Sequence, residues 1–219
     1  MKIKIDSMYQ NHIGIFDPEK YDHYPISIVG CGSVGSFTAL TLAKMGFKTL
    51  FIYDYDKVES HNIPVQFFNL ESVGSHKTTS LSKMIRHYSE CRATPMTIKY
   101  KSNLPFMSQI VIATTDNMES RKQIYKGCLK SKVKLLIDAR MGGEVFTIFT
   151  VDLTKKIERE KYEKTFHKTV NLKCTEKGII YNTLMIASSI TSQLVKVMQD
   201  EKYSFCVDCA TRTLEFYHS

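Results

Sequence analysis

Residues Ile28-Val-Gly-Cys-Gly-Ser-Val-Gly35 decide the fold. An apolar strand is predicted before this stretch, over Ile26–Val29, and a helix after it, over Ser36–Met45. Between them the backbone must bend tightly and approach a ligand phosphate, which leaves no room for a Cβ at the three glycines Gly30, Gly32 and Gly35. The first N–H groups of such a helix can bind an anion, and Ser33, in the loop just before them, is expected to contact the same ligand. The stretch therefore predicts a phosphate-binding loop.

Asp54 supports the same interpretation. It directly follows a second apolar strand, predicted over Thr49–Tyr53, and lies nineteen residues beyond Gly35. This is about the spacing at which a carboxylate receives ribose hydroxyl groups in dinucleotide-binding folds. Strand, glycine loop, helix, strand and acid in this order indicate nucleotide binding more strongly than the glycines alone, which also occur in structural turns.

The composition is typical of one globular domain. The chain has 219 residues, 43% of them hydrophobic, and no stretch reaches the roughly eighteen apolar residues of a membrane span. Its first residues lack the apolar core of a signal peptide, so we expect a cytoplasmic protein without a membrane partner. The net charge is +8, but there is no dense basic run with interleaved aromatic residues, so nucleic acid is not an expected partner.

Strand-like and helical patterns alternate along the first two thirds of the chain. Four more strands are predicted, over Met96–Tyr100, Gln109–Ala113, Val133–Ile137 and Val145–Val151. Two more helices are predicted between them, over His76–Ser89 and Asn117–Leu129. Strands separated by helices require right-handed crossovers, so we expect an α/β fold with a Rossmann-like, doubly wound, mainly parallel sheet.

We expect three parts within this domain. Residues 1–152 form the nucleotide-binding core, and residues 153–178 form a polar crossover loop without a clear period. Residues 179–219 form a helix and then a small C-terminal β-hairpin, turned at Ala210-Thr-Arg212. The helix carries an apolar stripe from Ile179 to Met198, which indicates packing in the core or at a subunit interface.

Polar side chains suited to a nucleotide follow the predicted strands. Parallel strands collect their ligands at their carboxyl ends, so these side chains should converge with the glycine loop on one crevice. They are Asp54, Asp56, Asn62, Gln66, Lys77 and Asp116. A lysine can balance phosphate charge while an aspartate holds Mg²⁺ beside it. The set therefore suits a nucleoside triphosphate with Mg²⁺.

Five longer motifs extend this set: Gly30-Cys-Gly-Ser-Val-Gly-Ser36, Asp54-Tyr-Asp-Lys-Val-Glu-Ser-His-Asn62, Val73-Gly-Ser-His-Lys77, Ala113-Thr-Thr-Asp-Asn117 and Arg140-Met-Gly-Gly-Glu144. With them the sequence, from about residue 24 to 196, resembles the ubiquitin-activating-enzyme-like adenylyltransferases, which include ThiF, MoeB and HesA. The resemblance implies an ATP-dependent enzyme, working as a homodimer. Such an enzyme would adenylate the C-terminal carboxylate of a ubiquitin-like or sulfur-carrier protein ending in glycine.

The resemblance also implies residue roles. Asp54 would bind ribose and Gly32 would lie against the phosphates. Asp116 would hold Mg²⁺, while the triphosphate would be contacted by Asn62, Gln66 and Lys77. Structural roles remain open for the same residues: Asp56 and Asn62 could cap a turn, Lys77 could be solvated on its helix, and Asp116 could be a helix N-cap. Arg121 is expected to form a salt bridge on a helix surface.

Two departures from the family pattern concern arginines. The family usually has an arginine just before the glutamine, where this chain has Val65, and many members bring another from their N-terminal segment. Here the first arginine is Arg86. A finger arginine contributes roughly 10³–10⁵ in rate to phosphoryl transfer, so we expect a catalytic Arg140 or a lysine to replace this charge.

Cysteines offer two further candidate sites. Relatives can place a catalytic cysteine in the crossover loop, and Cys174 lies there between Lys173 and Lys177, which could lower its pKa. An exposed cysteine without a role is the alternative. Cys206 and Cys209 have the spacing of half a zinc site, and relatives often bind structural Zn²⁺ with two such pairs. The other pair is missing here, so Zn²⁺ is possible only with help from His167 or Cys174.

Three functions remain open from the sequence. The first is adenylation of a small protein's C-terminus, with subsequent transfer to a cysteine as an extension. The second is an NAD(P)-dependent Rossmann oxidoreductase, which the glycine loop and Asp54 support equally but which leaves Lys77 and Asp116 unexplained. The third is a nucleotide-binding relative without turnover, for which Val65 is the best support. The partner's identity and the downstream pathway do not follow from the sequence.

Overall fold

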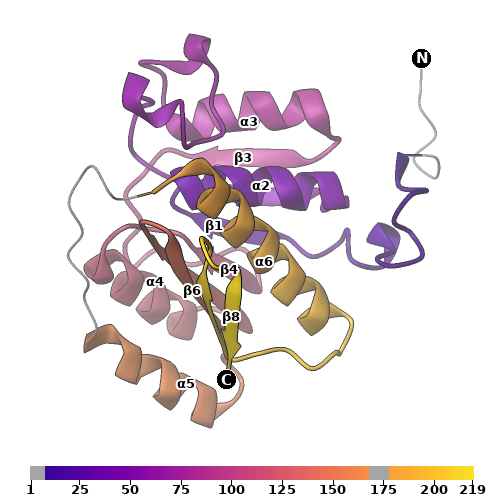
Figure 1. Ribbon diagram of the computed structural model, residues 1–219, viewed down its shortest axis with the longest axis vertical. Helices are drawn as coiled ribbons and strands as arrows, with labels where there is room; N and C mark the ends of the chain where they lie inside the picture. Colours follow the sequence, from indigo (N-terminus) through magenta and orange to yellow (C-terminus); the bar gives the residue numbers. More distant parts are fainter. Residues whose placement is uncertain (1–7, 168–177) are drawn as a thin grey trace.

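The computed structural model describes residues 8–167 and 178–219. One eight-stranded sheet runs through it in the order β3-β2-β1-β4-β5-β6-β7-β8 (Figure 1). Neighbours from β3 to β5 are parallel, and those from β5 to β8 are antiparallel. The strands are β1 (Ile26–Val29), β2 (Thr49–Tyr53), β3 (Arg92–Met96), β4 (Ile110–Ala113), β5 (Leu135–Gly142), β6 (Val145–Asp152), β7 (Cys206–Ala210) and β8 (Glu215–His218).

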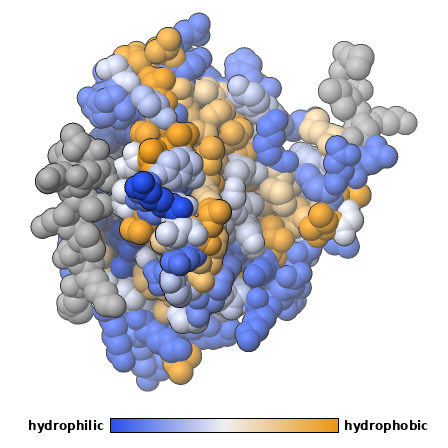
Figure 2. All heavy atoms as spheres, viewed as in Figure 1, coloured by the Kyte–Doolittle hydropathy of each residue, from blue (hydrophilic) through white to orange (hydrophobic). Residues whose placement is uncertain are grey.

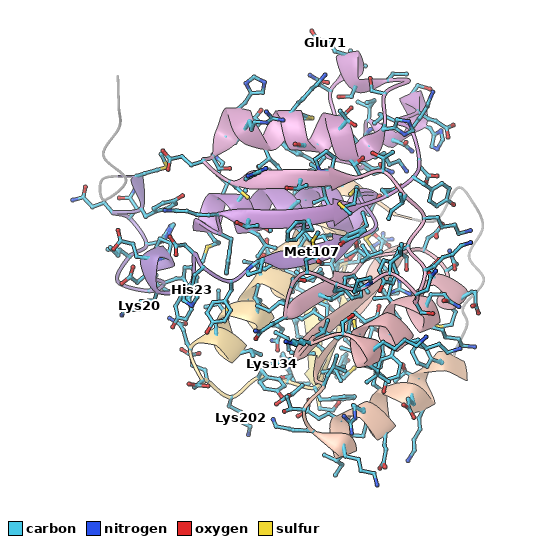
Figure 3. All side chains as sticks on the ribbon, turned by 180° about the vertical axis from the view of Figure 1, so that it is seen from behind. Lys20, His23, Glu71, Met107, Lys134 and Lys202 are labelled. Atoms are coloured by element: carbon cyan, nitrogen blue, oxygen red, sulfur yellow. The ribbon has the colours of Figure 1, made fainter. Side chains whose placement is uncertain are left out.

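Helices cover both faces of the sheet. One face carries α2 (Ser33–Met45), α3 (Lys77–Tyr88) and α6 (Ile180–Met198). The other carries α4 (Met118–Lys130) and α5 (Lys156–Glu163), seen from behind in Figure 3. Short 3₁₀ turns lie at η1 (Pro18–Lys20), η2 (Ser60–Asn62), η3 (Leu70–Ser72) and η4 (Lys164–His167). This arrangement confirms the predicted Rossmann-like, doubly wound fold.

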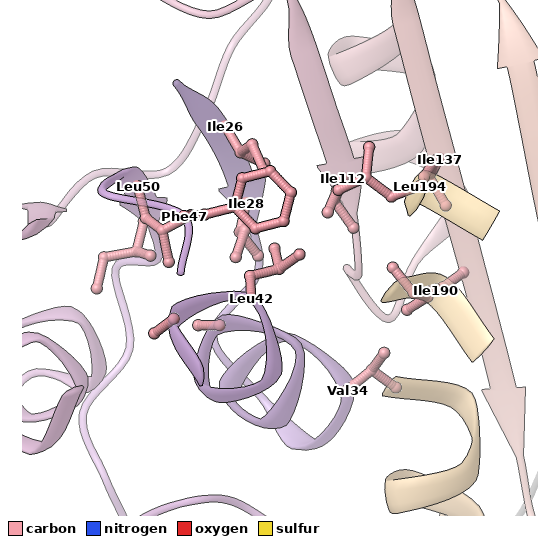
Figure 4. Close-up of a cluster of buried hydrophobic side chains, with 14 of the residues drawn as sticks. Ile26, Ile28, Val34, Leu42, Phe47, Leu50, Ile112, Ile137, Ile190 and Leu194 are labelled. Atoms are coloured by element: carbon pink, nitrogen blue, oxygen red, sulfur yellow. The ribbon is translucent and has the colours of Figure 1, made fainter. Parts of the chain in front are cut away.

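Strand composition explains the two-sided core. All four residues of β1 and of β4 are buried, as expected for parallel strands covered on both faces. Alternate side chains enter opposite clusters, so Ile112 packs with α2 and α6, whereas Val111 packs with α4. Figure 4 shows the first cluster, where Ile190 and Leu194 of α6 face the same core as Ile112. These apolar runs fix the register of the sheet.

The stripe on α6 is therefore mainly core. Ala187, Ile190 and Leu194 are fully buried within the chain, against α2 and the sheet. The sequence pattern left open whether the stripe packs in the core or at a subunit interface, and its central part packs in the core. The predicted C-terminal hairpin forms as β7 and β8, and it extends the main sheet through the pairing of β7 with β6. No described helix is long and apolar enough to cross a membrane.

Two predicted elements were wrong in position or kind. The third strand is Arg92–Met96 rather than Met96–Tyr100. It contains Pro95, which a central strand would exclude but which β3 accommodates because it lies at the sheet edge and pairs only with β2. Within the expected crossover loop 153–178, residues 156–167 are helical, forming α5 and η4. Tyr162 is the buried contact of α5 and explains why this polar segment holds a helix against the sheet.

Candidate nucleotide site

The glycine loop joins β1 to α2 at the point where the order of the sheet reverses. Gly30 has φ +100°, a left-handed conformation that side chains rarely adopt. A Cβ on Gly35 would lie 1.8 Å from the carbonyl oxygen of Gly30, so only glycine allows the helix to approach the loop this closely. Thr114 Oγ1, at the end of β4, donates to the same carbonyl oxygen at 2.8 Å. The loop is thus tied to the neighbouring strand.

The beginning of α2 is open. Gly32 is its N-cap and has no side chain to satisfy the first helical N–H groups. A Cβ built on Gly32 meets no heavy atom of the described chain within 4 Å. Gly32 therefore differs from Gly35: it is not required by packing, and the space beside it is free for a ligand. An uncapped helix N-terminus with such space is suited to an anion.

Asp54 lies beside this opening. Its Oδ2 accepts a hydrogen bond from the N–H of Cys31 at 2.7 Å, and its Oδ1 accepts one from the N–H of Asp56 at 2.8 Å. Burial raises the pKa of Asp54, although these two N–H groups and Lys77 oppose that rise. Each carboxylate oxygen keeps a further lone pair, so the group can still receive ribose hydroxyls.

Lys77 points back toward the Asp54 loop. Its Nζ donates to Asp56 Oδ2 at 3.2 Å, and its backbone N–H donates to the Asp56 carbonyl oxygen at 3.0 Å. The Lys77 side chain is only 10% exposed, whereas that of Asp56 is 47% exposed. The interpretation of Lys77 as a solvated surface lysine is therefore wrong. Lys77 is buried because a short antiparallel bridge between Lys57 and His76 holds the start of α3 against this loop.

Asn62 and Gln66 lie on the loop after Asp56. Asn62 is buried, and its Oδ1 accepts from the N–H of Glu59 at 2.9 Å. It therefore caps a turn, which is the structural role that the sequence left open for it. Gln66 Oε1 is buried and has no hydrogen-bond partner in the described chain. Ser36 of α2 accepts from the N–H of Phe67 at 2.9 Å, which ties this loop to the helix after the glycines. Gln66 therefore brings an unsatisfied acceptor to the region of the glycine loop.

The end of β4 supplies the remaining predicted residue. Asp116 is exposed, and its Oδ1 accepts from Asn117 Nδ2 at 3.1 Å. Asn117, not Asp116, is the N-cap of α4, because its side chain accepts from the N–H of Ser120 at 2.8 Å. Thr115 Oγ1 is a second buried oxygen without a hydrogen-bond partner among the described residues. Asp116 is consequently free of a capping role and available to a metal ion.

A buried ionic cluster lies beyond this loop. Asp138, at the end of the apolar part of β5, is completely buried and forms ion pairs with Arg121 and Arg140. Tyr162 donates to Asp138 Oδ2 at 3.0 Å. Arg121 is 6% exposed and also donates to the carbonyl oxygen of Thr115, so the expected surface salt bridge is instead a buried one.

Arg140 is engaged in this cluster. Its Nε donates to Asp138 Oδ2 at 2.8 Å, and its two other nitrogens donate to the carbonyl oxygen and Oγ1 of Thr165 at 3.2 and 2.8 Å. Its guanidinium carbon also lies 4.6 Å from the ring centroid of Phe149. The structure thus does not present Arg140 as a free finger, and its catalytic use stays a prediction. Cys174 lies outside the described residues.

The proposed zinc pair is wrong. Cys206 and Cys209 are three residues apart on β7, so their side chains point to opposite faces of the sheet. Cys209 packs with the α6 cluster and Cys206 with the α5 cluster. Burial raises the pKa of both thiols in the metal-free chain, that of Cys206 to about 12. Residues 8–167 and 178–219 contain no group of three or more potential metal ligands.

Sequence reasoning missed Thr114, Thr115, Asp138 and Tyr162. Asp138 directly follows the predicted strand Val133–Ile137, which is the signal that identified Asp54, and it could have been found in this way. Thr114 and Tyr162 carry no comparable pattern, because their roles depend on contacts between elements far apart in sequence.

Comparison with known proteins places this geometry in context. The sequence profile described as the ThiF family matches residues 9–216. Molybdopterin-synthase adenylyltransferase of Haemophilus influenzae is 27% identical over 188 residues, which cover 82% of this chain and 76% of that protein. Ubiquitin-like modifier-activating enzyme 5 of Rattus norvegicus is 39% identical over 72 residues, 33% of this chain and 18% of the relative's length.

The fold recurs in a solved structure. The crystal structure of Escherichia coli MccB with ATP superposes with a TM-score of 0.74 and 14% sequence identity. The alignment covers 92% of this chain and 65% of that one. At this identity the likeness concerns the fold, and this chain spans only part of the relatives it matches.

Proposed function

This chain belongs to the ThiF family, and from that premise we propose that it is an ATP-dependent adenylyltransferase. Its substrate would be the C-terminal carboxylate of a small protein of the ubiquitin-like or sulfur-carrier type, ending in glycine. A carboxylate oxygen attacks the α-phosphorus of ATP, the bond to the β-phosphate oxygen breaks, and pyrophosphate leaves. The product is the acyl-adenylate of the small protein.

One observation carries the proposal: free space at Gly32, on an uncapped helix start, beside the carboxylate of Asp54. The two buried oxygens without partners, Gln66 Oε1 and Thr115 Oγ1, lie on the loops around it. A buried polar atom without a hydrogen bond is unfavourable, so these two atoms can accept a hydrogen bond from a ligand, although His12, Thr150 and Asn182 carry such atoms elsewhere in the described chain. A nucleotide offers hydroxyl and amino donors as well as phosphate, and the residues present fit it.

The proposed roles follow from these positions. Asp54 receives the ribose, and the N–H groups at Gly32 and Ser33 face the phosphates. Lys77 leaves Asp56 for the more highly charged triphosphate, or bridges both. Asp116 supplies one carboxylate to Mg²⁺, and the phosphates and waters supply the other ligands, as is usual for nucleotide-bound Mg²⁺. The metal would neutralise charge on the leaving pyrophosphate.

The substrate class is supported by the relatives. One is named for activating a ubiquitin-like modifier and another for adenylating molybdopterin synthase. Transfer of the product to Cys174 remains part of the proposal, as does a cytoplasmic location. Family membership favours adenylation over the nicotinamide-dependent alternative, which gives no role to Lys77 or Asp116.

A nucleotide-binding protein without turnover is the second candidate. Val65 stands where the family usually has an arginine, and Arg140, the expected substitute, is engaged with Asp138 and Thr165. Nothing else described in the site favours it. Formation of AMP in the presence of the true partner separates the two candidates.

A homodimer belongs to the same proposal. Although the centre of α6 is buried, its first turns expose Ile179, Tyr181 and Leu184, each about two fifths or more exposed. Figure 2 shows hydrophobic residues on this face of the molecule, around the position of α6 in Figure 1. Light scattering of Leu184→Glu against the unmodified chain tests whether this surface joins two copies.

The decisive experiment is ATP–pyrophosphate exchange with purified candidate partners ending in glycine. The unmodified chain should show partner-dependent exchange that requires Mg²⁺. Asp116→Ala should abolish it and leave the unfolding transition unchanged, because an exposed carboxylate contributes little packing. Exchange near the unmodified rate in Asp116→Ala would refute the metal assignment, and ATP binding without any exchange would favour the non-catalytic candidate.

A further inference from the structure

Asp138 connects two segments that are far apart in sequence. On one side its Oδ1 pairs with Arg121, and the other guanidinium nitrogen of Arg121 donates to the carbonyl oxygen of Thr115. Thr115 immediately precedes Asp116. The loop at the end of β4 is therefore held from within the sheet by one buried carboxylate and one buried guanidinium.

On the other side Asp138 reaches α5 and η4. Its Oδ2 accepts from Tyr162 of α5 at 3.0 Å and from Arg140 Nε at 2.8 Å. Arg140 in turn donates twice to Thr165 of η4, and Thr165 Oγ1 donates to the carbonyl oxygen of Tyr162 at 2.7 Å. The carboxylate thus joins the β4 loop to the turn Lys164–His167 through a continuous chain of hydrogen bonds and ion pairs.

Because this network is buried, it couples the β4 loop tightly to the turn Lys164–His167. Asp138 and Tyr162 are fully buried, Arg121 is 6% exposed, and the Arg140 side chain is 18% exposed. Both carboxylate oxygens are occupied, and water has little access to replace a broken bond. A shift of either segment would therefore leave a buried charge or donor unpaired, which is strongly unfavourable.

We infer that Asp138 is a positioning residue, which fixes the loop of Thr115 and Asp116 relative to the turn Lys164–His167. The residue acts through Arg121 on one side and through Arg140 and Tyr162 on the other, and it touches neither nucleotide nor metal ion. This rests on the proposed function only for the use made of Asp116. The physical connection between the two segments stands independently of that use.

Hydrogen exchange of the ligand-free chain tests the connection. Asp138→Asn keeps the shape and removes the charge, so exchange should accelerate by at least about tenfold in residues 163–167 and at Thr114 and Ser120, whose N–H groups donate to the Val29 carbonyl oxygen and to Asn117 Oδ1 at the two ends of the β4 loop. Exchange in β1 should change much less, which separates a local effect from general unfolding. Acceleration of only one segment, or of neither, would overturn the inference.

A matched pair of tyrosine variants covers the case in which Asp138→Asn does not fold. Tyr162→Phe and Tyr125→Phe each remove one hydroxyl that donates to a carboxylate. Tyr162 donates to Asp138 at 3.0 Å, and Tyr125 donates to Glu163 at 2.7 Å. Of these two tyrosines, only Tyr162 donates to Asp138. Tyr162→Phe should accelerate exchange at Thr114 and Ser120, whereas Tyr125→Phe should not, and equal effects at these two amides would contradict the inference.

Kinetics gives a second readout wherever exchange with a partner is measurable. In Tyr162→Phe, kcat for pyrophosphate exchange should fall several-fold while KM for ATP changes less than about threefold, because the hydroxyl contacts neither Asp54 nor Lys77. A fall in kcat that Tyr125→Phe reproduces would count against positioning. If the unmodified chain shows no exchange with any partner, the proposed function fails, while the hydrogen-exchange result still decides the connection.

Discussion

Two groups of polar residues lie at the carboxyl ends of the parallel strands, and they differ in how their bonding capacity is used. Around Gly32 and Asp54 the helix start is uncapped, two buried oxygens lack partners among the described residues, and the acid of the ion pair between Lys77 and Asp56 is half exposed to solvent. Around Asp138 the carboxylate is fully buried and paired on both oxygens.

The difference separates binding from support. Unsatisfied groups cost stability in the ligand-free chain and are favourable only when a ligand completes them, whereas a saturated cluster stabilises the chain alone. Substitutions around Asp138 should therefore change the free energy of unfolding, and substitutions around Gly32 and Asp54 should change nucleotide affinity.

The largest effect is expected for Asp138→Asn. Removing one partner of a buried ionic cluster leaves uncompensated charge, so the free energy of unfolding should fall by about 3–5 kcal/mol. Asp56→Asn removes the carboxylate of a pair whose acid is 47% exposed and should lower it by roughly 0–1 kcal/mol. Urea denaturation measures both, and similar losses would show that the two regions do not differ in this way.

The second-largest effect is expected for Lys77→Ala, and it concerns nucleotide binding rather than stability. Loss of a charge-assisted bond to phosphate should raise the dissociation constant for ATP by about 10–100-fold and that for AMP much less. Lys83→Ala, at an exposed position of the same helix, serves as the control and should change neither. Calorimetric titration with both nucleotides measures this, and equal losses for ATP and AMP would place Lys77 away from the terminal phosphates.

The two glycines test the comparison within one loop. Gly35→Ala should lower the free energy of unfolding by about 1–3 kcal/mol, because its Cβ would meet the carbonyl oxygen of Gly30 at 1.8 Å. Gly32→Ala should change it by less than about 1 kcal/mol, since the space is open, yet weaken ATP binding. Undiminished ATP affinity in Gly32→Ala would remove the phosphates from this position.

Much of this architecture could be predicted from local pattern. The buried strands are short apolar runs, each followed by a polar residue or a glycine, so β1, β2 and β4 and the residues beyond their ends could be located. The edge strand β3 lies before its predicted position and contains Pro95, a residue that local pattern disfavours in a strand and that only the place of β3 at the sheet edge makes acceptable. Helix α5 was missed because one buried residue, Tyr162, gives no period.

The candidate site, too, could be predicted only in part from local pattern. Asp54, Lys77 and Asp116 could be chosen by type and position, but their hydrogen bonds could not. The role of Arg121 depends on a carboxylate seventeen residues away and on the backbone of Thr115. The separation of Cys206 from Cys209 depends on their lying in a strand rather than in a turn. Such roles arise from tertiary contacts, which spacing alone does not specify.

The smallest expected effect concerns pH and the carboxyl of Asp54. Burial raises its pKa above the ordinary value of 3.8, despite hydrogen bonds from the N–H groups of Asp56 and Cys31. The folded chain therefore keeps a proton that the unfolded chain releases, and this group's contribution to stability falls as pH rises from 3.8 through the folded pKa. This direction of pH dependence is expected of a buried carboxylate whose hydrogen bonds are completed only when a ligand binds.

The measurement is the difference in free energy of unfolding between the unmodified chain and Asp54→Asn, followed from pH 3.8 toward neutrality. The difference should move against the unmodified chain as pH rises. Asp152 provides the opposite sign: burial would raise its pKa, but hydrogen bonds from Thr154 and Lys155 lower it below 3.8. Its contribution should therefore be lost as pH falls below that value, and Asp152→Asn should show this. A difference for Asp54 that grows in favour of the unmodified chain would mean that its hydrogen bonds outweigh its burial, and that Asp54 is satisfied in the ligand-free chain as Asp138 is.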